Sequence, residues 1–168
     1  MKKNLSRYAI LPLVVLSLHC ARNPCPQAIG GSIVAHRSGI GFGKGKSFLE
    51  GTLTGVRGEC LLQDEGRPQH GSSAKGVAPR YEVAATADVA YEITDRERFD
   101  KARSSSVLGV QATVVFEAVT AQGVVLGTGQ GYVTFIPGVR TTSVSTKITG
   151  LSSGEISRVA KVQVRWKY

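Results

Sequence analysis

One segment alternates between apolar and polar side chains more strictly than any other part of the chain. From Tyr81 to Ile93 every second residue is Tyr, Val, Ala or Ile, and the residues between them are Glu, Ala, Thr or Asp. Successive side chains of a strand point to opposite faces of a sheet, so a period of two indicates a strand with one buried face. The segment predicts a long half-buried strand rather than an amphipathic helix.

The same alternation returns later in the chain, in residues 107–119, 124–136 and 159–168. The four residues 120–123 separate the first two of these segments, which predicts an antiparallel hairpin. Residues 140–148 are rich in Thr and Ser, as in a strand with one wet face. In the last segment the side chains expected to point inward are Ala160, Val162, Val164, Trp166 and Tyr168.

Six or seven such strands with short turns and no convincing helix predict an all-β domain. We expect a single antiparallel β-sandwich of the immunoglobulin-like kind, with a closed β-barrel as the alternative. The glycine-rich residues 28–46 and the polar residues 63–79 are expected to be loops. Residues 95–106 are expected to be a solvated connection, because Phe99 and Ala102 give them only a small apolar face.

The N-terminus has the three-part form of an export signal, with basic residues, an apolar run and then a cysteine. The apolar run from Ala9 to Leu18 is about half as long as a membrane span, so it fits the core of a signal peptide. We therefore expect residues 1–19 to be a signal peptide, 20–46 a lipidated, glycine-rich tether and 47–168 the sandwich domain.

The cysteine after this run resembles the lipobox of bacterial lipoproteins. The motif reads Ser17-Leu18-His19-Cys20, with histidine where most lipoboxes carry a small residue. The resemblance implies that Cys20 is acylated and becomes the first residue of a mature chain held at a membrane by its lipid. Ala21 stands where an Asp retains many lipoproteins in the inner membrane, which implies the outer membrane, on its periplasmic or surface face. Plain secretion and an uncleaved N-terminal anchor are the alternatives.

With Cys20 assigned to lipid, two cysteines remain in a chain sent to an oxidising compartment. Cys25 and Cys60 are therefore expected to form a disulfide. A metal site is the competing hypothesis, since His36 and His70 are available. Because the chain has neither C-x-x-C nor H-x-x-x-H spacing, we predict no metal, and no motif points to another cofactor.

None of the motifs that resemble catalytic or cofactor-binding motifs lies in the structural context that its chemistry requires. Gly45-Lys46-Ser47 matches only the end of a phosphate loop, and residues 127–131 form a G-x-G-x-G inside a predicted strand, where glycine marks a bulge or bend. Asp88 and Glu92 share a strand face, but four residues along a strand is about 13 Å, too far apart to flank one glycosidic bond. We therefore expect no catalytic residues and no enzyme.

The formal net charge is +9, or +6 once the three basic residues of the signal segment are set aside. Such a surplus can attract anionic partners. The basic residues are spread along the chain and form no arginine-rich tail or basic helix, so no nucleic-acid partner is expected.

The layout as a whole resembles small β-sandwich lipoproteins of Gram-negative bacteria. The resemblance rests on Cys25-Pro26 shortly after the lipobox cysteine, on Gly58-Glu59-Cys60 after a first predicted strand that begins at Phe48, and on the long alternating strands that follow. With a lipid anchor, a disulfide-tied sandwich and no catalytic cluster, we expect a non-enzymatic envelope lipoprotein. It would act as a structural or assembly accessory through protein–protein binding, with an envelope protein as its partner.

A secreted module that binds a ligand or a glycan is the alternative function. Such a module needs an exposed aromatic patch. Because Tyr81, Tyr91 and Tyr132 all fall on the predicted inward face of their strands, the sequence favours the accessory.

Overall fold

The computed structural model describes residues 23–40, 46–63 and 78–167. They form eight strands and two helices: β1 Gly30–Ile33, β2 Arg37–Ile40, β3 Leu49–Leu62, β4 Tyr81–Ile93, α1 Arg96–Ser104, β5 Val110–Val119, β6 Val125–Phe135, β7 Thr141–Leu151, α2 Ser153–Ile156 and β8 Lys161–Lys167.

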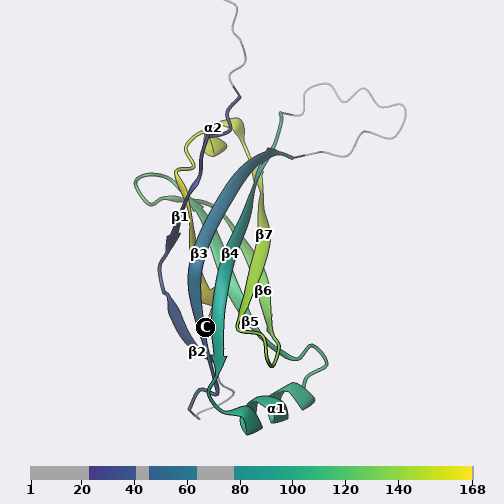
Figure 1. The fold of residues 1–168 in the computed structure, drawn as a ribbon. Helices are drawn as coiled ribbons and strands as arrows, with labels where there is room; N and C mark the ends of the chain where they lie inside the picture. Colours follow the sequence, from purple (N-terminus) through teal and green to yellow (C-terminus); the bar gives the residue numbers. More distant parts are fainter. Residues whose placement is uncertain (1–22, 41–45, 64–77, 168) are drawn as a thin grey trace, which may run out of the picture.

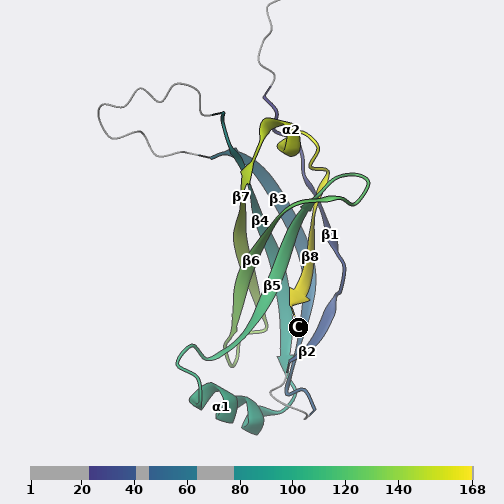
Figure 2. The same ribbon diagram turned by 180° about the vertical axis from the view of Figure 1, so that it is seen from behind.

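The strands make two four-stranded sheets that pack face to face (Figures 1 and 2). One sheet has the order β2-β3-β4-β7 and faces the viewer in Figure 1, and the other has the order β1-β8-β5-β6 and faces the viewer in Figure 2. Neighbouring strands are antiparallel except β1 and β8, which are parallel. The predicted β-sandwich is confirmed, and the sheets do not close into a barrel.

The core lies between the sheets and is built from the alternating positions. On β4, the side chains of Tyr81, Val83, Ala85, Ala87, Val89 and Tyr91 are all buried. The predicted hairpin is also confirmed, because β5 and β6 pair from Val110–Phe135 to Val119–Val125. On β8, Val162, Val164 and Trp166 point inward as expected, whereas Ala160 is exposed and Tyr168 lies outside the described residues.

The two sheets also meet along their edges. At one side β6 lies against β7, where the Thr146 hydroxyl donates a hydrogen bond of 3.0 Å to the Gln130 carbonyl. At the other side, Ile29 forms an isolated bridge with Gly58 of β3. A Cβ on Gly31 of β1 would meet the carbonyl of Val56, so only glycine lets β1 approach β3 this closely.

The contact between β6 and β7 depends on glycine as well. A Cβ on Gly131 would collide with Cγ2 of Val144 and lie 3.2 Å from the Ser145 carbonyl oxygen. We expect Gly131→Ala to lower the free energy of unfolding by about 1–3 kcal/mol, because overpacking forces β6 and β7 apart. Gly154→Ala is the matched control, since nothing lies within 4 Å of that position. Urea unfolding followed by circular dichroism measures both, and equal midpoints for the two variants would contradict this packing.

The expectation of a solvated connection at residues 95–106 is wrong, because nine of these residues form α1. The Asp95 side chain caps the helix by accepting a hydrogen bond from the Arg98 N–H at 3.1 Å. Phe99 is fully buried and meets the ring of Phe48 edge-on, with 6.2 Å between the ring centroids. One buried aromatic is therefore enough to dock a short capped helix on the end of the sandwich.

The expectation of a loop at residues 28–46 is also wrong where the structure describes it, because β1 and β2 lie there. Each joins an edge of a different sheet, so the sandwich includes residues that the sequence assigned to the tether. Most of the other expected loop, residues 63–79, lies outside the described residues.

The short helix α2 connects β7 to β8. Its capping box joins Ser152 and Glu155, whose carboxylate accepts from the Ser152 N–H at 2.8 Å and from the Ser152 hydroxyl at 2.7 Å. These hydrogen bonds favour the charged carboxylate and lower the pKa of Glu155 below its ordinary value.

Candidate functional site

The predicted disulfide is present. Cys25 and Cys60 are bonded, with 5.6 Å between their Cα atoms and 35 residues between them in sequence. Cys60 belongs to β3 and Cys25 precedes β1, so the bond joins segments of opposite sheets. Cys20, the predicted lipidation site, lies outside the described residues.

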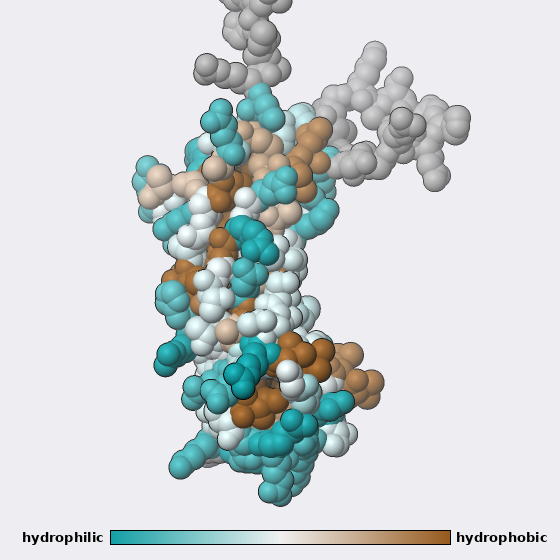
Figure 3. Space-filling model, in the orientation of Figure 1, coloured by the Kyte–Doolittle hydropathy of each residue, from teal (hydrophilic) through white to brown (hydrophobic). Residues whose placement is uncertain are grey.

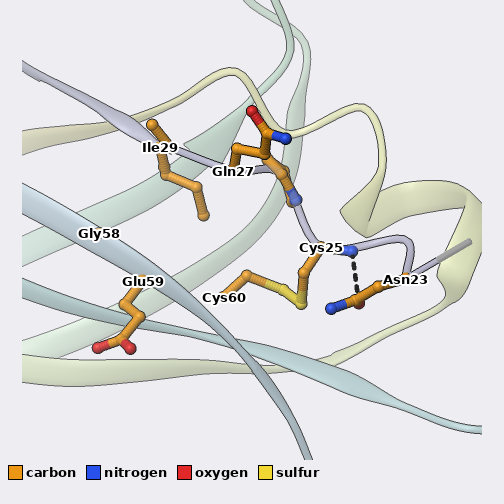
Figure 4. Close-up of a pocket in the computed structure, with 9 residues that line it drawn as sticks. Asn23, Cys25, Gln27, Ile29, Gly58, Glu59 and Cys60 are labelled. Atoms are coloured by element: carbon orange, nitrogen blue, oxygen red, sulfur yellow. Dashed lines mark hydrogen bonds between the residues drawn. A yellow bond between two sulfur atoms is a disulfide. The ribbon is translucent and has the colours of Figure 1, made fainter.

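A shallow hollow of about 520 Å³ surrounds this disulfide (Figure 4). Asn23 accepts a hydrogen bond of 3.1 Å from the Cys25 N–H, which shapes the chain just before the bond. The Gln27 amide and the Glu59 carboxylate point away from each other in Figure 4. Ligand sites need polar groups that converge. The hollow is therefore better explained as the joint where the N-terminal segment is fastened to β3.

Asp88 and Glu92 lie on the outer surface of β4, as the sequence predicted, whereas Glu82 is buried. Asp88 lines a second hollow of about 380 Å³, but it pairs with Arg57 at 2.9 Å on the neighbouring strand. At the far end of β4, Glu82 pairs with Lys147 at 2.7 Å. Asp88 and Glu82 are each neutralised by an exposed base, an arrangement that orders a surface and does not prepare an acid for catalysis.

The structure offers no metal site within its described residues, since no three His, Cys, Asp or Glu side chains gather there. His36 is exposed between β1 and β2, and His70 lies outside the described ranges. None of the described helices is long and apolar enough to cross a membrane.

The outer surface of the β2-β3-β4-β7 sheet is broad and carries short side chains. We call its centre the flat face and define it by Ala84, Thr86 and Ala90 of β4 and by Ser143 and Ser145 of the paired strand β7. The Thr86 and Ser145 hydroxyls are 2.9 Å apart and hydrogen-bonded. Figure 3 shows this face with pale, short side chains across its middle.

Exposed aliphatic side chains gather at the α1 end of the sandwich, where Figure 3 shows brown atoms toward the lower right. We call this surface the far tip and define it by Val107, Leu108, Ile136 and Val139. Val107 is completely exposed and Leu108 is 69% exposed. They occupy the two corner positions of a turn closed by a 3.1 Å hydrogen bond from the Gly109 N–H to the Ser106 carbonyl. Turn corners favour Gly, Pro, Asn, Asp and Ser, so turn chemistry does not explain a Val-Leu pair there.

The second turn of the far tip is held rigidly. Tyr91 is buried, and its hydroxyl donates to the Ile136 carbonyl at 2.9 Å while accepting from the Ile136 N–H at 3.0 Å. Its ring packs edge-on against Phe135 with 4.9 Å between centroids. The Tyr91 N–H also donates to the Arg140 carbonyl at 2.8 Å, so β4 fixes both ends of this turn.

The inward assignment of the tyrosines is confirmed for two of them and wrong for the third. Tyr81 and Tyr91 are buried, whereas Tyr132 is 66% exposed. The inward positions of β6 are taken by Gly127, Gly129, Gly131, Val133 and Phe135, and three glycines carry no side chain to reveal the alternation. Leu108 precedes β5 and belongs to the far tip.

Comparison with family models, with curated proteins and with solved structures found no match to this chain.

Proposed function

We propose that the chain is an exported, lipid-anchored and non-enzymatic accessory of the bacterial envelope, which holds a partner protein against the flat face. Acylation at Cys20 would tether the N-terminus at the outer membrane. The described chain begins at the end of the sandwich that carries α2 and the disulfide (Figures 1 and 4). The domain would then be linked to the membrane through its N-terminal segment, and the outer surfaces of both sheets would stay accessible to a partner.

The proposed protein contact is supported mainly by the size of the outer sheet surface around the flat face and by the short side chains at its centre. The strands β3, β4 and β7 have 14, 13 and 11 residues. At about 3.3 Å per residue and 4.8 Å between strands, they make a surface on the order of 600 Å². A standard protein interface buries about 800 Å² on each partner, so the outer surface of these three strands, with the flat face at its centre, is close to the required size.

The side chains of the flat face also favour binding. Ala, Ser and Thr have little rotamer freedom to lose, whereas immobilising a long side chain costs about 0.5–1.5 kcal/mol. The longer side chains beside them, Arg57 and Lys147, are already placed by their ion pairs. The flat face therefore loses little side-chain entropy when a partner binds.

Site-specific photo-crosslinking in intact cells tests this proposal. A photoreactive residue in place of Ser145 should give one major adduct with an envelope protein in the membrane fraction, and one in place of Thr128, exposed on the other sheet, should not. Ala84→Arg should abolish the Ser145 adduct. Loss of membrane recovery on Cys20→Ala would support the anchor. An adduct at neither position, or recovery only as free unlipidated protein, would refute the proposal.

The exposed Tyr132 favours a secreted binding module as the second candidate. It lies on the outer face of β6, near Lys167, whose ammonium donates to the Gln130 amide oxygen at 3.2 Å. Tyr and polar neighbours can stack and hydrogen-bond a sugar. Glycan-array binding that is lost in Tyr132→Ala, without a Ser145 adduct, would select this candidate.

A further inference from the structure

We propose that the far tip inserts into an anionic phospholipid surface. This inference goes beyond the proposed function, because it requires neither the acylated N-terminus nor a partner protein on the flat face. It concerns the opposite end of the molecule from the disulfide joint, as Figures 1 and 2 show for α1 and α2.

The shape of the far tip is the first reason. Its four aliphatic side chains come from two turns that continue outward from the paired residues Val110 and Phe135. They form a knob, not a groove, and four side chains are few beside the roughly 20–30 residues that each partner contributes to a stable protein complex. A lipid interface accepts a small apolar knob, because its acyl boundary can deform around side chains that enter by about 5–10 Å.

The charge around the knob is the second reason. Lys101 and Arg103 precede Val107, and Arg140 follows Val139; all three side chains are exposed. None of the three makes an ion pair with a residue that the structure describes. The chain also contains no Asp or Glu from residue 118 to residue 154. Exposed carboxylates at this end, such as Glu92 and Glu97, lie on β4 and α1 rather than on the two turns. Cations beside exposed aliphatic side chains complement phosphate headgroups above an acyl layer.

The rigidity of the knob is the third reason. The turn with Ile136 and Val139 is fixed by the buried Tyr91, so these side chains are presented to a surface without a loss of loop entropy. No comparable arrangement is needed for a loop that only connects β6 to β7, since Pro137 and Gly138 already form the turn.

Tryptophan fluorescence in the full chain tests the proposal. The chain carries Cys20→Ser, so that no lipid anchor contributes, together with Leu108→Trp as the reporter. The native Trp166 is 1% exposed and gives a constant background. With vesicles of phosphatidylglycerol and phosphatidylcholine, we expect a blue shift at position 108 and quenching by lipids spin-labelled near the headgroup. Val124→Trp, exposed at the opposite end, separately reports insertion through the N-terminal segment.

Charge and apolar variants identify the contact. Each basic residue near an anionic surface contributes about fivefold in affinity. The double variant Arg103→Gln with Arg140→Gln should therefore bind the vesicles about 25-fold more weakly, as measured by quenching at position 108. Val107→Ser should also weaken it, and Val125→Ser at the opposite end should not. The proposal is overturned if position 108 is unquenched, if phosphatidylcholine alone works equally well, or if a photoreactive residue at 108 gives a protein adduct in cells instead of a lipid adduct. The Ser145 adduct is measured separately, so the two proposals can fail independently.

Discussion

Replacing Trp166 by alanine is expected to lower the free energy of unfolding by about 3–5 kcal/mol, as for other buried aromatic side chains. Trp166 lies on β8 of one sheet and is 1% exposed. Its ring packs against Gly51 of β3 in the other sheet, where an added Cβ would lie 3.0 Å from ring atom Cζ2. The indole therefore fills the space between the sheets. Urea unfolding followed by far-ultraviolet circular dichroism measures the loss.

Two variants separate the role of the ring from that of the residue. Trp166→Phe should cost clearly less, because it keeps a ring in the cavity and removes a buried Nε1–H that has no hydrogen-bond partner among the described residues. Gln163→Ala on the outer face of β8 should change stability by less than about 0.5 kcal/mol. A Trp166→Ala variant as stable as the Gln163→Ala variant would show that the sheets do not pack through this ring.

The long strands were predictable because their side chains report directly which face is buried. On β4 and β5 the inward residues are apolar and large enough to carry the period of two, and a turn separates β5 from β6 at the expected place. Such alternation reflects the free energy of moving each apolar side chain out of water. The burial of each position can therefore be predicted from the residue found there.

The short elements could not be predicted in the same way, because tertiary contacts decide them. Gly30 and Gly31 have no side chains to form a pattern, and β1 exists because its backbone pairs with β8. The helix α1 depends on Phe99 finding a place beside Phe48. In β6 the inward glycines hid the alternation, and Tyr132 was assigned to the wrong face.

The candidate sites also differ in how far the sequence predicts them. The pairing of Cys25 with Cys60 follows from counting cysteines once Cys20 is set aside, and the structure confirms it. The flat face and the far tip each combine residues that are distant in sequence, such as Thr86 with Ser145 or Leu108 with Ile136. The sequence signals for the far tip were two aliphatic residues in a turn and the absence of acidic residues from 118 to 154.

Replacing Cys60 by serine is expected to lower the free energy of unfolding by about 3–4 kcal/mol, because a loop closed over 35 residues restricts the unfolded chain by about that amount. Wild-type protein treated with a thiol reductant should fall to the same stability. Cys25→Ser should match Cys60→Ser, and the double variant should lose nothing further, since either single change already removes the bond. Cys20→Ser keeps the bond and should unfold like the wild type.

Local unfolding in the variant without the disulfide should begin at β1. This strand has four residues, two of them glycine, and none of its side chains is fully buried. Its hydrogen bonds to β8 and the Ile29–Gly58 bridge hold it weakly, and the disulfide holds the preceding segment to β3. Hydrogen exchange of the Cys60→Ser variant should therefore show lost protection at Gly30 and Val34, whose N–H groups donate to the Ala160 and Val164 carbonyls, while Val83 and Val114 in the central strands keep a protection reduced only by the global loss of stability. Equal residual protection at Gly30 and Val83 would contradict this expectation, because β1 would then open only together with the whole sandwich.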